Sequence, residues 1–259
     1  MKWRAIDTGC NTASWNMAFD HHLVGLVGKG KAPPTLRFYW FCPQGVTIGY
    51  FQRFTDELAW FADSGIQVVR RLTGGKAVLH SGDLTYSFVF REDNPVLRGT
   101  VLEVYKLISQ GFVKGLRALG VPVEMVKGKK KGDVKGPLCF QAVSFYEVVI
   151  DGKKVLGSAQ MRRGGVILQQ GSLLLYDPEP PFYSVEGMTT VESATGMRLN
   201  RRGVMEAIIE GMSSALGIDF IWEDCSMDIP AELVEFYSSS EWNRERQGNF
   251  TLDIITSNL

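Results

Sequence analysis

The chain has 259 residues, with 45% hydrophobic and 22% charged residues, which suits one large globular domain and argues against disorder. Lysine plus arginine equals aspartate plus glutamate at 28 each, so the molecule has no basic excess for nucleic acid. Neither a secretory signal nor a run of about 18 apolar residues, as a membrane span requires, is recognisable. Cys10, Cys42, Cys139 and Cys225 lie far apart, so we expect free thiols in a reducing cytoplasm and no metal site.

The first third of the chain predicts one helix followed by short strands. Residues 13–27 form the expected helix, with Ser14 as its N-cap and with Phe19, Leu23 and Leu26 on one face. Strand-like runs follow at residues 35–41, 45–51, 66–72 and 83–90. The run at 83–90 alternates as a half-buried strand does, and a Gly-Gly loop at 73–80 comes before it.

The later residues alternate long helices with strands joined by tight turns. Amphipathic helices are predicted over 100–120 and 201–217, and strands over 144–150, 151–160 and 164–176. The segment 230–247 predicts a helix with a polar end. This pattern indicates an α+β fold with a mixed, largely antiparallel sheet core and flanking helices. We expect a single domain over residues 1–245, helical from about residue 196, and a tail over 246–259.

The segment "RRLTGGKAVLH" is the first candidate for chemistry. Gly74 and Gly75 follow a strand and let a ligand approach the backbone, or they mark an ordinary turn. Arg70 and Arg71 could hold a carboxylate or phosphate, or they could be solvated. His80 is either a substrate contact or a structural histidine with satisfied hydrogen bonds.

The segment "KKVLGSAQ" is the second candidate. Gly157, Ser158 and Ala159 are all small, as the wall of a ligand cleft would be. Lys154 lies in an alternating strand, where it either faces that cleft as a partly desolvated cation or extends to the surface. In the first case its charge could stabilise a thiolate or an acyl oxyanion.

Cys139 is the third candidate, and it follows a lysine-rich run. The residue lies between a loop and a strand, and it is either a buried thiol or a nucleophile activated by a nearby cation such as Lys154. The run from Lys127 to Gly136 is either a solvated loop or a docking patch for an acidic partner.

Together these segments resemble the biotin/lipoate protein ligase superfamily. "RRLTGGKAVLHSGDLTYS" is similar to the family's RRxxGGxxVxH signature, and "GKKVLGSAQ" to its lysine-bearing segment. "ASWNMAFD", "TLRFYWFCPQGVTIGYFQ" and "YSSSEWN" resemble further family blocks, so the likeness runs from about residue 3 to 245. "LCFQAVSFYEVVIDGKKVLGSAQ" looks closest to the octanoyltransferases of Gram-positive type that act on the glycine cleavage H protein.

The resemblance implies the catalytic-domain fold of that superfamily and an acyl transfer without a cofactor. Cys139 would carry the octanoyl group as a thioester, and Lys154 would lower the pKa of Cys139 and stabilise the oxyanion. The predicted substrate-binding residues are Arg70, Arg71, Gly74, Gly75, His80, Gly157, Ser158 and Ala159. Octanoyl-acyl carrier protein would be the donor and a lipoyl-domain protein, such as the glycine cleavage H protein, the acceptor. We expect a cytoplasmic monomer that binds neither nucleic acid nor membrane.

Three other functions stay open on the sequence. An ATP-dependent lipoate–protein ligase would use Lys154 to hold a lipoyl-adenylate and would give Cys139 no role. An amidotransferase would move the acyl group between lipoyl-domain proteins. A non-catalytic acyl-binding protein would keep the fold and form no covalent adduct.

Overall fold

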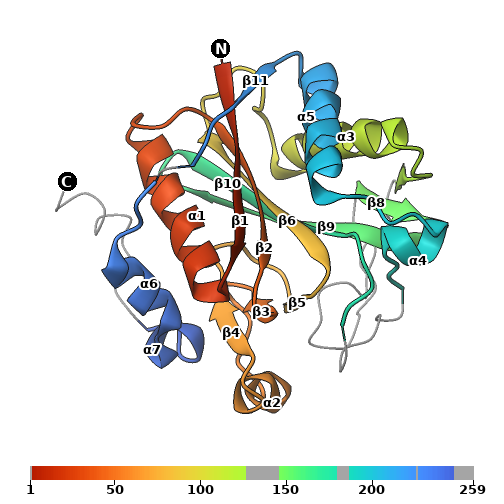
Figure 1. The fold of residues 1–259 in the computed structure, drawn as a ribbon. Coiled ribbons are helices and arrows are strands. Elements are labelled where there is room, and N and C mark those ends of the chain that lie inside the picture. The colour runs from red at the N-terminus through yellow and green to blue at the C-terminus, as the bar shows by residue number, and fades with distance from the viewer. Residues whose placement is uncertain (1, 127–145, 180–186, 226, 248–259) are drawn as a thin grey trace.

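The computed structural model describes residues 2–126, 146–179, 187–225 and 227–247, and Figure 1 shows their arrangement. Cys139 and the lysine-rich run lie outside these residues. Among the described helices, none combines the length and the apolarity that a membrane span needs.

A large sheet forms the centre of the molecule, in the strand order β11-β1-β2-β6-β10-β9-β8-β7. Its strands are β1 (Lys2–Asn11), β2 (Thr35–Phe41), β6 (Asp83–Arg91), β7 (Glu124–Val126), β8 (Glu147–Ile150), β9 (Lys153–Arg163), β10 (Val166–Leu174) and β11 (Asp219–Trp222). β1 pairs in parallel with β2 and β11, whereas the pairs from β2 to β7 are antiparallel. The predicted mixed, largely antiparallel sheet is therefore confirmed.

A second, smaller sheet contains the strands β4 (Gln67–Arg70), β3 (Gly45–Ile48) and β5 (Val78–His80), in that order. β3 pairs in parallel with β4 and antiparallel with β5. β5 falls inside the segment that the sequence predicts as a Gly-Gly loop. Three residues are too few to show a strand period, which explains why the prediction missed it.

Helices cover both faces of the large sheet (Figure 1). The helices of the described residues are α1 (Ala13–Gly28), α2 (Asp56–Asp63), α3 (Val101–Ala118), α4 (Val191–Thr195), α5 (Arg201–Leu216), α6 (Ala231–Ser238) and α7 (Ser240–Asn243). α3 and α5 form the main core with one face of the sheet, and α1 covers the other face. α3 and α5 come very close at Gly115, which has no Cβ. A Cβ at this position would lie only 2.4 Å from the Ala207 carbonyl oxygen.

Burial on both faces corrects the prediction for residues 83–90. Phe88 and Phe90 pack in the core under α3 and α5, and Val89 packs against α1. All of β6 except Arg91 is buried, so the strand is central and not half-buried. The alternation in the sequence remains because the face toward α1 also carries polar residues, such as Ser87, whose hydroxyl forms a hydrogen bond with that helix.

Two local predictions at the start of the chain are wrong. Thr12, and not Ser14, caps α1, because its side chain accepts a hydrogen bond from the Trp15 amide. Cys10 and Cys42 form a disulfide and are not free thiols. The parallel pairing of β1 with β2 brings their Cα atoms to 5.4 Å, although 32 residues separate them in the sequence.

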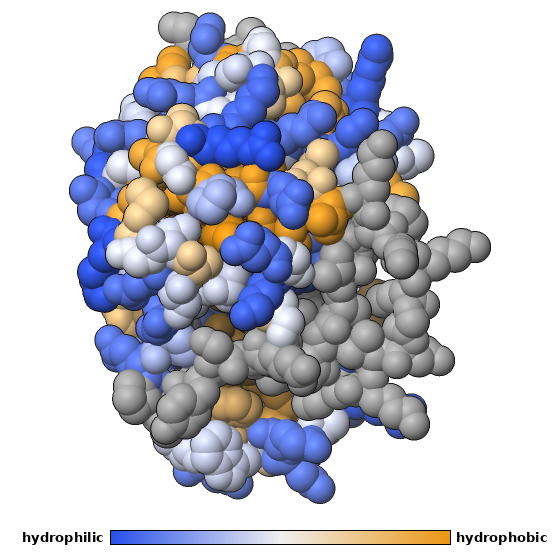
Figure 2. All heavy atoms as spheres, turned by 90° about the vertical axis from the view of Figure 1, so that its right-hand side faces the viewer, coloured by the Kyte–Doolittle hydropathy of each residue, from blue (hydrophilic) through white to orange (hydrophobic). Residues whose placement is uncertain are grey.

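The predicted helix is α6, and the predicted polar end is exposed at residues 244–247. Between them the short helix α7 carries the buried residues Trp242 and Asn243, which the sequence reading did not predict. The rest of the described surface mixes hydrophilic and hydrophobic side chains, as Figure 2 shows for one face. The exposed large hydrophobic residues within the described part are Phe51, Trp60, Val101, Leu102 and Ile221.

Candidate active site

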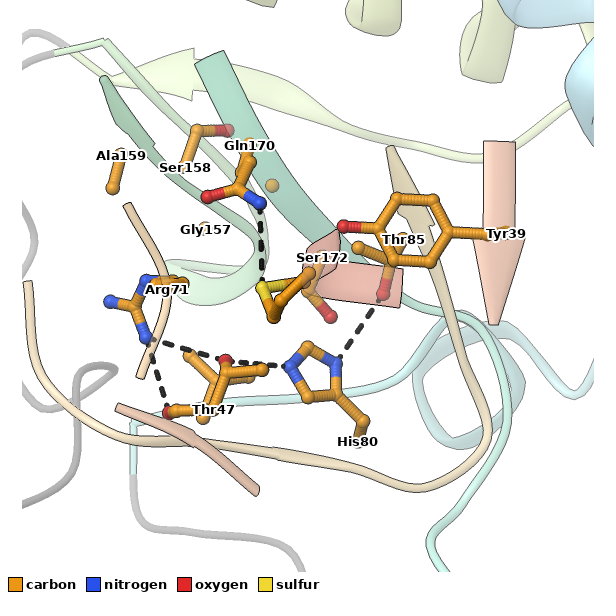
Figure 3. Close-up of a pocket in the computed structure, with 13 residues that line it drawn as sticks. Tyr39, Thr47, Arg71, His80, Thr85, Gly157, Ser158, Ala159, Gln170 and Ser172 are labelled. Carbon is orange, nitrogen blue, oxygen red and sulfur yellow. Dashed lines mark hydrogen bonds between the residues drawn. The ribbon is translucent and has the colours of Figure 1, made fainter. Parts of the chain in front are cut away.

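A cavity lies where the small sheet meets the large sheet (Figure 3). It contains about 420 Å³ of empty space, part of which is open to solvent. The lining residues are Met17, Tyr39, Thr47, Arg71, Val78, His80, Thr85, Gly157, Ser158, Ala159, Gln170, Gly171 and Ser172. Five residues predicted from the sequence, Arg71, His80, Gly157, Ser158 and Ala159, therefore meet around one cavity.

The small residues of β9 form one wall of the cavity because β9 and β10 pack tightly there. A Cβ on Gly171 would lie 2.3 Å from a Tyr86 ring carbon and 2.5 Å from Ser158 Oγ. Ser158 Oγ lies 2.8 Å from the Tyr86 hydroxyl, which also accepts a hydrogen bond from Gln169. Burial raises the pKa of Tyr86 to about 12, so this hydroxyl stays protonated. The wall is a fixed, neutral surface.

His80 is held in one orientation by contacts on every side. Its ring stacks on Phe41 with the ring centroids 3.8 Å apart. Nδ1 lies 2.8 Å from Asp83 Oδ2, and Nε2 lies 2.9 Å from Thr47 Oγ1. The structural alternative for His80 is thus correct, and the ring also lines the cavity, so the two alternatives do not exclude each other.

Asp83 anchors His80 as a buried anion. Burial alone would raise the pKa of Asp83, but the charge of His80 and hydrogen bonds from His80, Ser172 and Thr85 together lower it below its usual value. The Ser172 and Thr85 hydroxyls lie 2.5 and 2.7 Å from Oδ2. The carboxylate therefore fixes the base of the cavity on the side of β5 and β6.

The two adjacent arginines of the signature have different tasks. Arg71 lines the cavity, and its guanidinium donates to the carbonyl oxygens of Thr47, Gly74 and Lys76. Arg70 lies outside the cavity lining, where burial lowers its pKa to about 10. Its guanidinium donates to five backbone carbonyls, those of Gly49, Tyr50, Gln52, Trp242 and Asn243. Its predicted substrate contact stays a prediction.

Gly74 and Gly75 shape the cavity from behind and do not line it. Gly75 has a φ of 93°, a conformation that favours glycine. The loop passes so close to Gly49 that a Cβ there would lie 1.9 Å from the Gly75 carbonyl oxygen. Arg71 then holds the loop through the Gly74 carbonyl at 2.6 Å. The close backbone approach that the sequence predicts at Gly74 and Gly75 is, in the structure, an approach to Gly49 of the same chain.

A buried polar network under the cavity escaped the sequence reading. Asp20 of α1 accepts hydrogen bonds from Arg37 at 2.7 Å, Gln170 at 2.7 Å and Tyr39 at 3.0 Å. Burial and the Asp20 charge raise the pKa of Tyr39 well above its usual value. The Arg37 guanidinium also lies 3.8 Å from the centre of the Tyr39 ring. The signal was available, since a charge among apolar helix residues and a polar pair within an apolar strand both require buried partners.

Lys154 is buried in an ion pair beside this site. Its Nζ lies 2.5 Å from Glu147 Oε1, and both residues are 3% exposed. The alternative in which Lys154 extends to the surface is therefore wrong. Lys154 does not line the cavity, but Gly157, three residues further along β9, does. Glu147 went unnoticed in the sequence because it stands at the start of an otherwise apolar strand.

No group of three histidine, cysteine, aspartate or glutamate residues in the described ranges could hold a metal ion. The site offers small residues and fixed polar groups, with the buried cation Arg71 in its lining and Lys154 beside it, which suits acyl binding and charge stabilisation.

Known proteins share the sequence pattern of this site. The profile of the lipoyl protein ligase A/B catalytic domain matches residues 12–213. The chain belongs to this family. It is 34% identical to octanoyltransferase LipM of Moorella thermoacetica, over 94% of this chain and 98% of that protein. It is 37% identical to octanoyltransferase LipM of Kyrpidia tusciae, over 93% and 98%.

Solved structures of the lipoyl protein ligase family share the fold as well. Lipoate-protein ligase A bound with ATP is 25% identical and superposes with a TM-score of 0.73, over 94% of this chain and 99% of that one. The archaeal bi-partite lipoate protein ligase from Thermoplasma acidophilum is 24% identical, with a TM-score of 0.71 over 96% and 98%. The predicted family and fold class are thus confirmed.

Proposed function

We propose that this protein transfers an octanoyl group to a lysine of a lipoyl-domain protein through a thioester on Cys139. Octanoyltransferase is the activity named for its curated relatives, which match over nearly the whole chain, and this confirms the predicted acyltransferase class. The structural observation that carries the proposal is a buried cation, Lys154, on the strand that also supplies the small-residue wall of the cavity.

The reaction has two steps with a covalent intermediate. The Cys139 thiolate attacks the carbonyl carbon of the donor thioester, the new carbon–sulfur bond forms, and the donor leaves as a thiolate. The neutral amine of the acceptor lysine then attacks the acyl-enzyme and forms the amide as the carbon–sulfur bond breaks; the proton that the amine loses leaves with the sulfur, so Cys139 is released as a thiol. Splitting the transfer lets two bulky protein substrates bind one after the other. A nearby ammonium such as Lys154 favours the thiolate and the tetrahedral oxyanion.

The cavity would receive the acyl chain along the wall from Gly157 to Ala159, with Arg71 and His80 opposite. Arg70, Gly74 and Gly75 would act through the loops that they hold. The small residues leave room for methylene groups, and the fixed polar groups would orient the carbonyl end.

We propose octanoyl-acyl carrier protein as the donor and the glycine cleavage H protein, or a similar lipoyl-domain protein, as the acceptor. The lysine-rich run from Lys127 to Gly136 would attract acidic partners. We further propose a cytoplasmic monomer with one catalytic domain over residues 1–245 and no cofactor.

Substitution of Cys139 tests the proposal. Cys139→Ser should abolish octanoyl transfer to the acceptor protein, whereas Cys225→Ser, at the free thiol of the described part, should transfer normally. Normal transfer by Cys139→Ser would disprove the thioester route. A requirement for ATP and magnesium with free lipoate would instead favour a ligase, the function named for a solved structure of the same fold.

A further inference from the structure

The cavity opens to solvent on one side and is closed on the other. Val78 of β5 and Ser158 and Ala159 of β9 are only partly buried, so the opening lies at these two strands. Met17 of α1 and Tyr39 of β2 also line the cavity but are 3% and 0% exposed. Figure 3 shows Ala159 and Tyr39 on opposite sides of the cavity. A ligand that enters from solvent therefore ends against α1 and β2.

The core packs tightly behind the closed end. Met17 belongs to a hydrophobic cluster whose buried members include Ala13, Ala18, Tyr39 and Val69. Protein interiors are close-packed, so the space that remains at this end is set by the volumes of the side chains that face it. The reach of the Met17 side chain therefore limits the depth of the cavity.

The polar side chains at the closed end are held by other polar groups. The Tyr39 hydroxyl and the Gln170 amide donate to Asp20 at 3.0 and 2.7 Å, and Gln170 Oε1 accepts from Thr73 at 2.8 Å. Gln170 Nε2 also lies 3.7 Å from Met17 Sδ, but a thioether is only a weak acceptor. Met17 can therefore be replaced without removing a strong hydrogen bond from this network.

The proposed donor fixes the direction in which an acyl chain enters. Its carbonyl carbon is bonded through a thioester to a carrier protein, which is far too large for a cavity with about 420 Å³ of empty space. The methyl end of the chain therefore enters first, and the carbonyl stays at the open end. The terminal methyl group then reaches the closed end, where an apolar and adaptable methionine side chain suits it.

We propose that Met17 determines which acyl-chain length the cavity accepts, because its side chain stops the terminal methyl group at the closed end. The inference rests on the proposed function and deepens it, since it names a specificity-determining residue for the acyl substrate. A longer chain overlaps with the Met17 side chain. A shorter chain leaves the closed end unfilled and loses about four-fold in binding for each missing methylene.

Met17→Ala should deepen the closed end of the cavity. Alanine lacks Cγ, Sδ and Cε, which leaves room for about two further methylenes after the neighbours partly collapse. The measurement is kcat/KM for acyl transfer from decanoyl- and from octanoyl-acyl carrier protein to the acceptor. The ratio of decanoyl to octanoyl should rise about ten-fold or more. Met17→Val keeps more bulk, so it should raise the ratio by a smaller factor, and it decides the question if the alanine variant does not fold.

Calorimetric titration with octanoic and decanoic acids measures the same preference without catalysis. The ratio of the two affinities should change in Met17→Ala in the same direction as the ratio of kcat/KM. Met205→Ala is the matched control, because Met205 is 1% exposed in the core of α5 and lies outside the cavity lining. This variant should lose stability in a thermal scan but keep the wild-type ratios.

Unchanged ratios in both Met17 variants would overturn the inference, and so would an equal rise in Met205→Ala. Failure of the proposed function looks different. The wild-type protein would then form no octanoyl adduct on Cys139, whereas the affinities for octanoic and decanoic acids would still depend on the residue at position 17.

Discussion

Replacing Asp20 by alanine should remove the support of the cavity floor and much of the stability of the protein. The Asp20–Arg37 pair is fully buried, with side chains 1% and 0% exposed. Removing one partner of a buried pair costs about 3–5 kcal/mol, because the other charge is stranded. Gln170 and Tyr39 also lose their acceptor, at about 1 kcal/mol each. The expected loss is about 5 kcal/mol or more, against a total of about 5–15 kcal/mol for native proteins.

Urea unfolding at neutral pH measures this loss, and a thermal scan should show a fall in Tm of about 10–20 °C. Glu206→Ala is the matched control, because it breaks an exposed pair with Arg202 that is worth less than about 1 kcal/mol. Because Gln170 and Tyr39 line the cavity, any folded Asp20→Ala protein should also show a raised KM. A loss below about 1 kcal/mol would refute the reasoning that this network supports the site.

Gly49→Ala should cost about 3 kcal/mol or more, because its Cβ would lie 1.9 Å from the Gly75 carbonyl oxygen, whereas Gly74→Ala meets no atom within 4 Å and should stay within about 0.5 kcal/mol. Equal effects in urea unfolding would contradict this. Burial, with the charges of nearby residues, lowers the pKa of His21 from 6.5 to about 3, so the unfolded chain binds this proton first as pH falls. Stability should therefore drop by about 2 kcal/mol between pH 6.5 and pH 5 through this residue, and the drop should be absent in His21→Gln. The lysine of Arg70→Lys cannot donate hydrogen bonds to all five backbone carbonyls that Arg70 contacts. The rate of amide hydrogen exchange in residues 49–53 should therefore rise about ten-fold or more, and an unchanged rate would contradict the role of Arg70 in holding this segment.

Local patterns predicted the elements that are long and strongly periodic. The helix α3 shows spacings of three and four, and the Asp151-Gly152 turn between β8 and β9 has positive φ at both residues, as that dipeptide predicts. Short β5 and the two-sided burial of β6 were missed, because each depends on which elements pack around it. The Cys10–Cys42 pairing likewise follows from strand register, which spacing in the sequence does not reveal.

The candidate site was predictable where motifs concentrate chemistry and unpredictable where partners are distant. Arg71 and His80 were predicted from one signature, and the wall of small residues from Gly157 to Ala159 was predicted from another. Asp20 and Gln170 lie 150 residues apart, and their contact exists only in the fold. The different contacts of Arg70, the last residue of β4, and Arg71, which follows it, were also hidden, since the sequence does not show which of two adjacent side chains faces the cavity.

Intact mass after incubation with octanoyl-acyl carrier protein, followed by peptide mapping, tests the central claim most directly. We predict a gain of one octanoyl group on Cys139 that disappears when the acceptor protein is added. Transfer of octanoyl to the acceptor with no adduct on Cys139 at any time would contradict the account.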